Sequence, residues 1–306
     1  MSDPTPTPRR FAIDAHDFAA PPLPGGLYIV STPIGNLRDI TIRALQTLAA
    51  ADIIACEDTR TTRVLLRHYG ISAPLIAYHE HNADAQRPKI LAALDEDKVI
   101  ALVSDAGTPL ISDPGYRLVA DVTGAGHLVV PIPGASAILA GLVAAALPTD
   151  AFFFAGFLPT RTVGRVKRIA ALAAVPGTLV FYESPHRTAE TLADLAATLG
   201  ADRPATLARE LTKTFETHRR GTLGSLAAEL AEEATPKGEI VIMVGPPEES
   251  AAEPGDVDSL LLRLIQDLSV KEAAQQAAAT TGLPRRDLYQ RALALKQGDG
   301  ADGDEG

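Results

Sequence analysis

The sequence predicts an α/β protein that contains more than one domain. Along most of the chain, short apolar runs that suit buried strands alternate with longer segments of helical periodicity. The length of 306 residues corresponds to about two domains of ordinary size. Hydrophobic residues make up 46% and charged residues 22% of the chain, which is the composition of a globular protein with a buried core.

The first domain is expected over residues 25–148. Its predicted strands are the apolar runs 27–30, 52–56, 99–103 and 128–132. The helical patterns between and after them cover 42–50, 61–69, 88–96, 116–124 and 136–147. Strands that alternate with helices in this way predict a mainly parallel sheet with helices on both faces.

The second domain is expected over residues 149–247. Its strand candidates are 152–157, 178–183, 205–210 and 239–245. Ser184 followed by Pro185 is typical of a helix start, because proline is tolerated in the first helical turn. The same α/β alternation therefore continues into this half of the chain.

The remaining segments differ in composition from the two domains. Residues 1–24 are rich in proline and lack apolar periodicity, so a disordered tail is expected there. Proline, glycine, serine and glutamate in 248–256 predict a linker. Two helical patterns around Gly282 predict a helix-turn-helix-like unit over 257–297, and 298–306 is an acidic tail.

Composition excludes several classes of protein. A single cysteine, Cys56, excludes a disulfide framework and a cysteine-based zinc cluster. No apolar stretch has the length of a transmembrane helix, and the N-terminus lacks the hydrophobic core of a signal peptide. A cytoplasmic location is therefore expected.

The charge distribution leaves two interpretations open. The net charge of −10 argues against a nucleic-acid partner. Residues 157–220, however, contain 10 basic and 6 acidic residues, a net of +4. Four basic residues, Arg161, Arg165, Lys167 and Arg168, fall close together in this segment. They form either a solvated helix face or a phosphate-binding surface on an acidic protein.

Three loops rich in glycine and proline follow predicted strands: residues 31–41, 104–116 and 131–137. In an open α/β sheet, ligands bind beyond the carboxyl ends of the strands, where such loops gather. The dinucleotide fingerprint G-x-G-x-x-G and the P-loop G-x-x-x-x-G-K-[ST] are both absent, so these loops predict a ligand site of another kind.

Seven segments occur in a characteristic order: TPIGNLRDIT, CEDTRTT, SDAGTPLISDPGY, PIPGASA, FYESPHR, LARELTKTFET and KGEIVIMVG. Together they resemble the tetrapyrrole methylase superfamily, and within it the bacterial enzymes that methylate a cytidine ribose 2′-oxygen in 16S rRNA. The resemblance covers about residues 25–247. The helical pair after it is similar to the small helix-turn-helix appendage of that group.

The resemblance implies two α/β domains, a homodimer, and S-adenosylmethionine as the cofactor, bound in the cleft between the domains. Pro33 and Gly35 would line the cleft floor. The amino-acid end of the cofactor would be held by Ser104, Asp105, Ala106 and Gly107. The other implied cofactor contacts are Ser136, Ala137, Gly238 and Ile240. No metal is implied, because the leaving group is a neutral thioether.

Methyl transfer to a ribose hydroxyl needs alignment of the reactants and a group that accepts the hydroxyl proton. The catalytic candidates are Asp58, Glu183 and Lys213. Asp58 could instead cap the helix that follows it. Arginine grips phosphate with two parallel hydrogen bonds, so the candidates for substrate binding are the basic residues Arg60, Arg165, Lys167, Arg187 and Arg209.

Three functions remain open at this stage. The first is ribose methylation of 16S rRNA in the small ribosomal subunit. The second is C-methylation of a tetrapyrrole, whose carboxylates the same arginines would suit. The third is a non-catalytic ribosome-assembly factor that uses the basic segment and the helical pair for binding.

Overall fold

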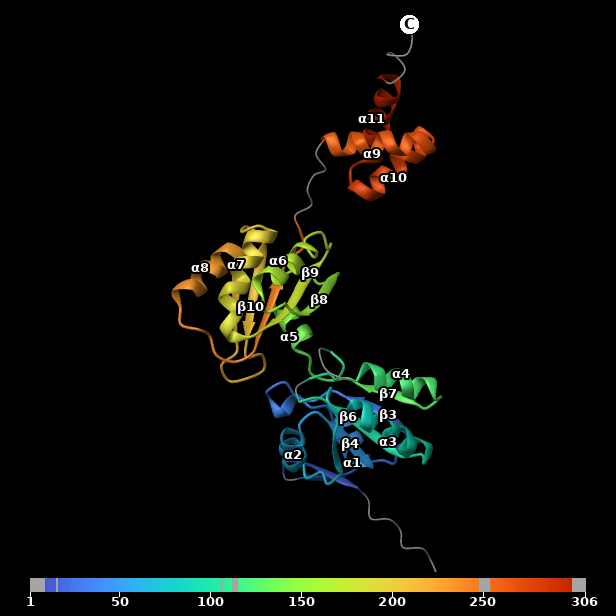
Figure 1. The fold of residues 1–306 in the computed structure, drawn as a ribbon, viewed down its shortest axis with the longest axis vertical. Coiled ribbons are helices and arrows are strands. Elements are labelled where there is room, and N and C mark those ends of the chain that lie inside the picture. The colour runs from blue at the N-terminus through green and yellow to red at the C-terminus, as the bar shows by residue number, and fades with distance from the viewer. Residues whose placement is uncertain (1–8, 15, 106, 112–114, 248–253, 299–306) are drawn as a thin grey trace, which may run out of the picture. The chain divides into compact units, whose positions relative to one another are not determined.

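The computed structural model describes residues 9–14, 16–105, 107–111, 115–247 and 254–298 (Figure 1). The chain divides into two compact units, residues 1–246 and 247–306. The first unit contains two five-stranded sheets and the second unit is helical. The predicted α/β class is confirmed for the first unit.

The first sheet has the strand order β5-β4-β6-β3-β7, and all of its strands are parallel. The strands are β3 (Gly26–Val30), β4 (Ile53–Cys56), β5 (Leu75–Ala77), β6 (Val99–Val103) and β7 (Val129–Ile132). Four of them match the predicted runs, and the short strand β5 lies at the edge. The central strand β6 is buried along its whole length, which explains its continuous apolar sequence.

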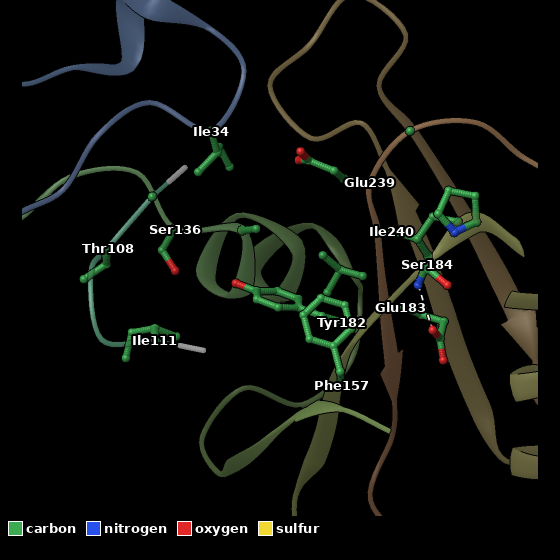
Figure 2. Close-up of a pocket in the computed structure, with 15 residues that line it drawn as sticks. Ile34, Thr108, Ile111, Ser136, Phe157, Tyr182, Glu183, Ser184, Glu239 and Ile240 are labelled. Atoms are coloured by element: carbon green, nitrogen blue, oxygen red, sulfur yellow. Dashed lines mark hydrogen bonds between the residues drawn. The ribbon is translucent and has the colours of Figure 1, made fainter. Parts of the chain in front are cut away.

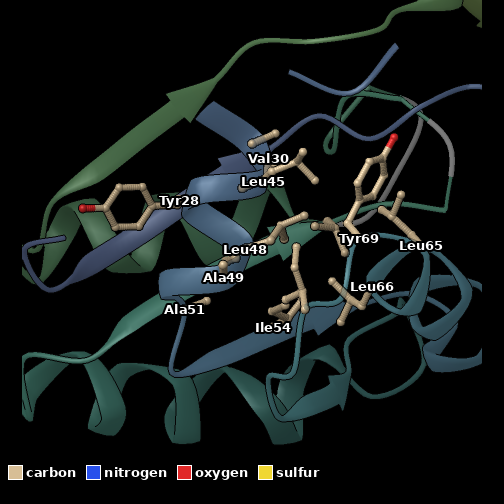
Figure 3. Packing of buried hydrophobic residues seen from close by; sticks show 14 of the residues in the cluster. Tyr28, Val30, Leu45, Leu48, Ala49, Ala51, Ile54, Leu65, Leu66 and Tyr69 are labelled. Atoms are coloured by element: carbon tan, nitrogen blue, oxygen red, sulfur yellow. The ribbon is translucent and has the colours of Figure 1, made fainter. Parts of the chain in front are cut away.

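Helices cover both faces of this sheet, as predicted. On one face, α1 (Ile42–Ala50) and α2 (Thr59–His68) pack their apolar residues against β3 and β4 (Figure 3). On the other face, α3 (Ala83–Asp95) and α4 (Tyr116–Gly124) bury Ile90, Leu94, Leu118 and Val122. Asp58 caps the N-terminus of α2, so the helix begins directly after the end of β4.

The expected disorder of residues 1–24 is wrong for residues 10–13 and 16–19. This segment forms an antiparallel hairpin of β1 (Arg10–Ile13) and β2 (His16–Ala19). Phe11 is buried in the same cluster as α1 and α2, and Ala12 donates a backbone hydrogen bond to Tyr69. Arg9 forms an ion pair with Asp52 at 2.5 Å. Burial of one aromatic ring together with these polar contacts orders a segment whose composition suggested a tail.

The second sheet is mixed and has the order β11-β10-β12-β9-β8. Its strands are β8 (Phe152–Phe157), β9 (Thr178–Glu183), β10 (Pro204–Arg209), β11 (Thr217–Thr222) and β12 (Ile240–Val244). The polar edge strand β11 was not predicted, because its sequence THRRGT lacks apolar alternation. The helices α6 (Thr162–Ala170), α7 (Thr188–Leu199) and α8 (Leu223–Glu232) share one core with this sheet. The 3-10 turn η2 (Pro185–Arg187), with Ser184 at its N-cap, leads into α7.

Helix α5 (Ala137–Ala144) follows the last strand of the first sheet but packs against the second. Ile138 and Leu142 share a buried cluster with Val180, Val241 and Met243. The chain therefore passes to the second sheet before α5, ahead of the predicted boundary at residue 148.

Arg165 was predicted to be a surface residue of a basic cluster, and the structure corrects this. Its side chain is 2% exposed. Its Nε donates to Asp194 at 2.6 Å, and its terminal nitrogens reach Glu190 and the Thr160 carbonyl. Burial of a charged group requires such partners. Arg165 thus joins α6 to α7 inside the unit, while Lys167 on the same helix is exposed.

Within residues 254–298, the described part of the second unit, there are three helices where two were expected: α9 (Pro254–Asp267), α10 (Val270–Thr281) and α11 (Arg285–Gly298). The helix α9 begins inside the predicted linker 248–256, of which residues 248–253 lie outside the described part of the chain. Gly282 ends α10 in a left-handed conformation, as predicted. The core of this unit is made of Val257, Leu261, Ala274, Ala277, Leu288 and Ala292. Among the described residues, no helix has both the length and the apolar character needed to cross a membrane.

Replacement of Arg165 by methionine should lower the free energy of unfolding by about 3 kcal/mol, because it leaves the Asp194 carboxylate without its cation. The matched control is Lys167→Met on the exposed side of the same helix, which should change stability by less than about 0.5 kcal/mol. Urea unfolding of the two variants checks this. Equal stability of both variants would show that the Arg165–Asp194 pair does not hold α6 on α7.

Candidate active site

The carboxyl ends of the parallel strands point into a cavity of ≈ 400 Å³ between the two sheets of the first unit. One wall is built by the loops after β3, β6 and β7, with Ile34, Thr108, Ile111 and Ser136 (Figure 2). The opposite wall is built by the second sheet, with Phe157, Tyr182, Gly238 and Ile240. We call this the first cavity. Its walls are mainly apolar, and its volume lies within the range of small-molecule sites.

Two glycines shape the first cavity. Gly107 has φ +92°, and a Cβ there would lie 3.1 Å from Cγ2 of Ile34. Gly238 has φ +94°, and a Cβ there would overlap the carboxyl group of Glu210. Both positions combine a positive φ with a close approach, so a side chain would strain the backbone and displace a neighbour. The predicted cofactor residues Gly107, Ser136, Ala137, Gly238 and Ile240 all line this cavity.

A second cavity of ≈ 420 Å³ adjoins the first. It is lined by the predicted residues Pro33, Gly35, Ser104, Asp105 and Lys213, and by Thr61, Thr62, Val64 and Leu65 of α2. Among the described residues, Ile34 and Glu239 line both cavities. Ile34 and Glu239 therefore mark the boundary between two adjoining compartments.

Lys213 bridges the two halves of the site. Its aliphatic stem lies where a side chain at Gly35 would be, and its Nζ pairs with Glu210 at 2.8 Å and Glu239 at 3.3 Å. Burial opposes the charge of Lys213, but the hydrogen bond to Glu210 and the charge of Glu239 outweigh it. The pKa of Lys213 is therefore raised. The pKa of Glu210 is lowered by its hydrogen bonds from Lys213 and from the backbone N–H of Glu239. The pair is charged at neutral pH.

Asp58 lies at the carboxyl end of β4, where its carboxylate accepts hydrogen bonds from the side chain and the backbone N–H of Arg60. These bonds lower the pKa of Asp58 to about 2. Its own backbone N–H donates to Asp105 at 3.1 Å, which joins the ends of β4 and β6. The capping role considered for Asp58 is confirmed, because its side chain accepts from the first turn of α2.

Glu183 belongs to the lining of the first cavity, but its carboxylate is paired with Arg187. The Glu183 side chain is 0% exposed and contacts Arg187 at 2.5 Å. It also accepts hydrogen bonds from the Ser184 N–H and the Thr191 hydroxyl, each at 2.7 Å. Figure 2 shows its carboxylate turned toward Ser184 rather than toward the first cavity. Arg187 donates to the Leu158 carbonyl as well, so both residues hold the turn before α7.

The other predicted residues are dispersed. Ala106 lies outside the described residues. Arg209 is half-buried and donates to the Thr217 hydroxyl, while Lys167 is exposed on α6. Arg60 is 87% exposed despite its pairing with Asp58.

Sequence reasoning missed Glu239, which stands between the predicted residues Gly238 and Ile240 in KGEIVIMVG. Its position directly before β12, next to Gly238, was the signal that could have identified it. Within the described part of the chain, no group of three or more His, Cys, Asp or Glu residues is arranged to hold a metal ion.

Two family models match the chain. The model described as Tetrapyrrole (Corrin/Porphyrin) Methylases matches residues 26–227, and the model described as RsmI C-terminal HTH domain matches residues 251–296. A relative from Mesorhizobium japonicum named Ribosomal RNA small subunit methyltransferase I is 56% identical over 290 residues, which cover 95% of this chain and 98% of the relative. A protein of the same name from Escherichia coli O157:H7 is 49% identical, over 88% of this chain and 95% of that protein.

Solved structures share the fold of the first unit. A cobalt-precorrin-4 methyltransferase of cobalamin biosynthesis matches with a TM-score of 0.56 and 19% identity, over 72% of this chain and 94% of that one. A uroporphyrin-III C-methyltransferase from Thermus thermophilus, in complex with S-adenosylhomocysteine, matches with a TM-score of 0.50 and 20% identity, over 72% of this chain and 97% of that one. At these identities the likeness concerns the fold.

The Asp58 carboxyl group should stay ionised at pH values where ordinary aspartates have taken up a proton. In Arg60→Gln its pKa should rise from about 2 toward the usual 3.8, because the guanidinium hydrogen bond is the largest cause of the shift. Because the pKa of Asp58 is lower in the folded than in the unfolded protein, its ionisation stabilises the folded state at pH values above the unfolded pKa. That stabilisation is lost as the pH falls through the folded-state pKa of about 2. Carbon-13 NMR of the side-chain carboxyl checks this, with Arg63→Gln as the matched control. An unchanged titration in Arg60→Gln would contradict the assigned cause.

Proposed function

Since this chain belongs to the tetrapyrrole methylase family, we propose that it transfers a methyl group from S-adenosylmethionine to small-subunit rRNA, at the ribose 2′-oxygen of a cytidine. The observation that carries the proposal is the pair of adjoining cavities at the strand ends, where the motif loops meet. The names of the relatives support the rRNA substrate. A ribosomal substrate is consistent with the cytoplasmic location that we propose.

The first cavity suits the cofactor. Its apolar side chains, including Phe157 and Tyr182, offer surfaces for a flat base. Gly107 and Gly238 keep the walls open where a Cβ would close them. The Ser136 hydroxyl makes no cap hydrogen bond to α5 and faces the cavity (Figure 2). Four of the proposed cofactor residues line the second cavity instead: Pro33, Gly35, Ser104 and Asp105. In our proposal the cofactor contacts them by extending past Ile34, at the boundary of the two cavities.

When bound, S-adenosylmethionine supplies a methyl group on a positively charged sulfur. The protein's part in our proposal is to hold the acceptor ribose in the second cavity and align its 2′-oxygen past Ile34. The 2′-oxygen would take the methyl group, the neutral thioether would leave with the electron pair of the carbon–sulfur bond, and the protein's part would be to accept the hydroxyl proton. We assign the role of this proton-accepting base to Glu239, because Glu239 lines both cavities and its side chain is 68% exposed.

The catalytic candidates Asp58, Glu183 and Lys213 take other roles in this proposal. A carboxylate with a pKa of about 2 is a weak base, so Asp58 is assigned to position Arg60 for the substrate. Glu183 is assigned to support the wall of the first cavity through Arg187 and Thr191. Lys213 carries a proton already, so it is assigned to hold Glu239 in place by charge.

Two further parts of the proposal concern assembly and substrate contact. Apolar side chains are exposed on α5 and on the edge strand β8, among them Val143 at 79% and Phe152 at 45%. An exposed apolar face of this kind supports the homodimer that we propose.

In the helical unit, Arg285 and Arg286 are exposed, whereas Arg291 is paired with Asp258. We assign Arg285 and Arg286, together with Lys167 and Arg209, to contacts with rRNA phosphates.

The substrate assignment is tested by transfer of a tritiated methyl group to isolated small ribosomal subunits and, in parallel, to uroporphyrinogen. Label is expected in the rRNA and not in the tetrapyrrole. A 2′-O-methylated nucleotide lacks the hydroxyl that attacks its own phosphate, so the labelled position should resist alkaline hydrolysis. Transfer to uroporphyrinogen alone would establish the tetrapyrrole alternative, and no transfer to either would favour the assembly factor.

Two variants separate cofactor binding from chemistry. Gly107→Leu should lose S-adenosylmethionine binding in calorimetry, because the side chain would meet Ile34 and fill the first cavity. Glu239→Gln should keep the cofactor affinity and lower kcat by about 10² to 10⁴. Unchanged affinity in Gly107→Leu would contradict the cofactor site, and an unchanged kcat in Glu239→Gln would remove its role as base.

A further inference from the structure

The outer face of α2 carries positive charge on a protein whose net charge is −10. Between Thr59 and His68 the helix contains Arg60, Arg63, Arg67 and His68 and no acidic residue. All four side chains are exposed. Within the described part of the chain, Arg63 and Arg67 form neither an ion pair nor a side-chain hydrogen bond. We call Arg60, Arg63 and Arg67 the α2 basic face.

The spacing of these residues places them along one side of the helix. Residues three, four and seven positions apart share a helix face, so Arg60, Arg63 and Arg67 form a row about 10 Å long. The first of them follows Asp58 at the carboxyl end of β4, beside the second cavity. The row therefore runs along the exposed side of a helix whose residues Thr61, Thr62, Val64 and Leu65 line the second cavity.

Hollows flank the helix on two sides. The second cavity is lined by Thr61, Thr62, Val64 and Leu65. A separate groove of ≈ 370 Å³ is lined by Arg63, Leu66 and Arg67 and by the turn from Gly70 to Ala73. Arg63 and Arg67 of the α2 basic face therefore border this groove. A row of cations about 10 Å long matches the repeated charges of an extended polyanion better than a single small anion.

Stabilisation of α2 does not by itself explain why its exposed face is basic. Basic residues in the last turn interact favourably with the helix dipole, which accounts for Arg67 and His68. Arg63 lies in the middle of the helix, where that effect has faded. At the N-terminal end of the helix the nearby carboxylates include Glu57, Asp105 and Asp58, and Asp58 is paired with Arg60. At the other end, Asp14 and Asp39 act on the Tyr69 phenol.

We propose that the α2 basic face binds the sugar–phosphate backbone of the substrate RNA and leads the target nucleotide into the second cavity. The proposal rests on the proposed function, because it assumes that the second cavity receives the acceptor ribose. Guanidinium groups bind phosphate oxygens with two parallel hydrogen bonds, and unpaired arginines do so without breaking an internal ion pair. Contacts of this kind position the RNA and carry no sequence information.

The test compares Arg63→Gln/Arg67→Gln with Lys89→Gln/Arg117→Gln. The control removes two exposed charges from α3 and α4, on the opposite face of the same sheet. Binding to isolated small ribosomal subunits is measured at several salt concentrations. Loss of two phosphate contacts should lower the slope of log K against log[salt] by about 1.4 to 1.8, whereas the control should keep the wild-type slope. The affinity for S-adenosylmethionine should be unchanged in both.

The outcomes separate this proposal from the proposed function. An unchanged slope in Arg63→Gln/Arg67→Gln, or an equal change in the control, overturns the proposal that the α2 basic face binds RNA. Neither result bears on methylation by the wild type. If wild-type protein transfers no methyl group to the subunits but the α2 variant still flattens the slope, the surface stands and the proposed function fails. A thermal melt equal to that of the wild type shows that a flattened slope does not come from unfolding.

Discussion

The site depends on one contact between the two sheets of the first unit. The loop after β3 places Ile34 in the apolar cluster of the second sheet, while Lys213 lays its stem against Gly35. The Nζ of Lys213 then pairs with Glu210 and Glu239. An apolar anchor and an ion pair thus bring the strand ends of the first sheet to the start of β12, and both cavities exist because of that approach.

Some charged side chains of this protein form ion pairs inside the first unit, and others are exposed on its surface. Arg165 with Asp194, and Arg187 with Glu183, are satisfied inside the unit, where an unpaired charge would be costly. Arg63 and Arg67 have no such partner among the described residues and stay in water. Basic residues that look alike in the sequence therefore have opposite roles, and their ionic partners tell them apart.

The two adjoining cavities give the proposed reaction a simple layout. One compartment is apolar, with backbone groups exposed at glycines, and suits a cofactor that must be held closely. The other combines apolar side chains with hydroxyls, the carboxylates of Asp105 and Glu239 and the ammonium of Lys213, and it is lined in part by α2. Ile34 separates them, so donor and acceptor would approach from different sides. Solved porphyrinoid methyltransferases share this fold at about 20% identity, and a shared fold does not by itself fix a substrate.

Much of the architecture was determined by the sequence alone. Buried parallel strands must be apolar throughout and must alternate with helices, so β3, β4, β6 and β7 and the class of the fold could be predicted from local pattern. The loops after β3, β6 and β7 were predicted from the glycine and proline that follow apolar runs, whereas Gly107, Ser136, Gly238 and Ile240 were expected at the site because their motifs resemble those of a known family. Only the tertiary structure decided the environment of each charge and of each polar segment. The partners of Arg165, the burial of Phe11 and the place of Glu239 between two cavities come from residues distant in the chain. Local periodicity reports which side of an element is apolar, whereas ion pairing and burial depend on which elements meet in space.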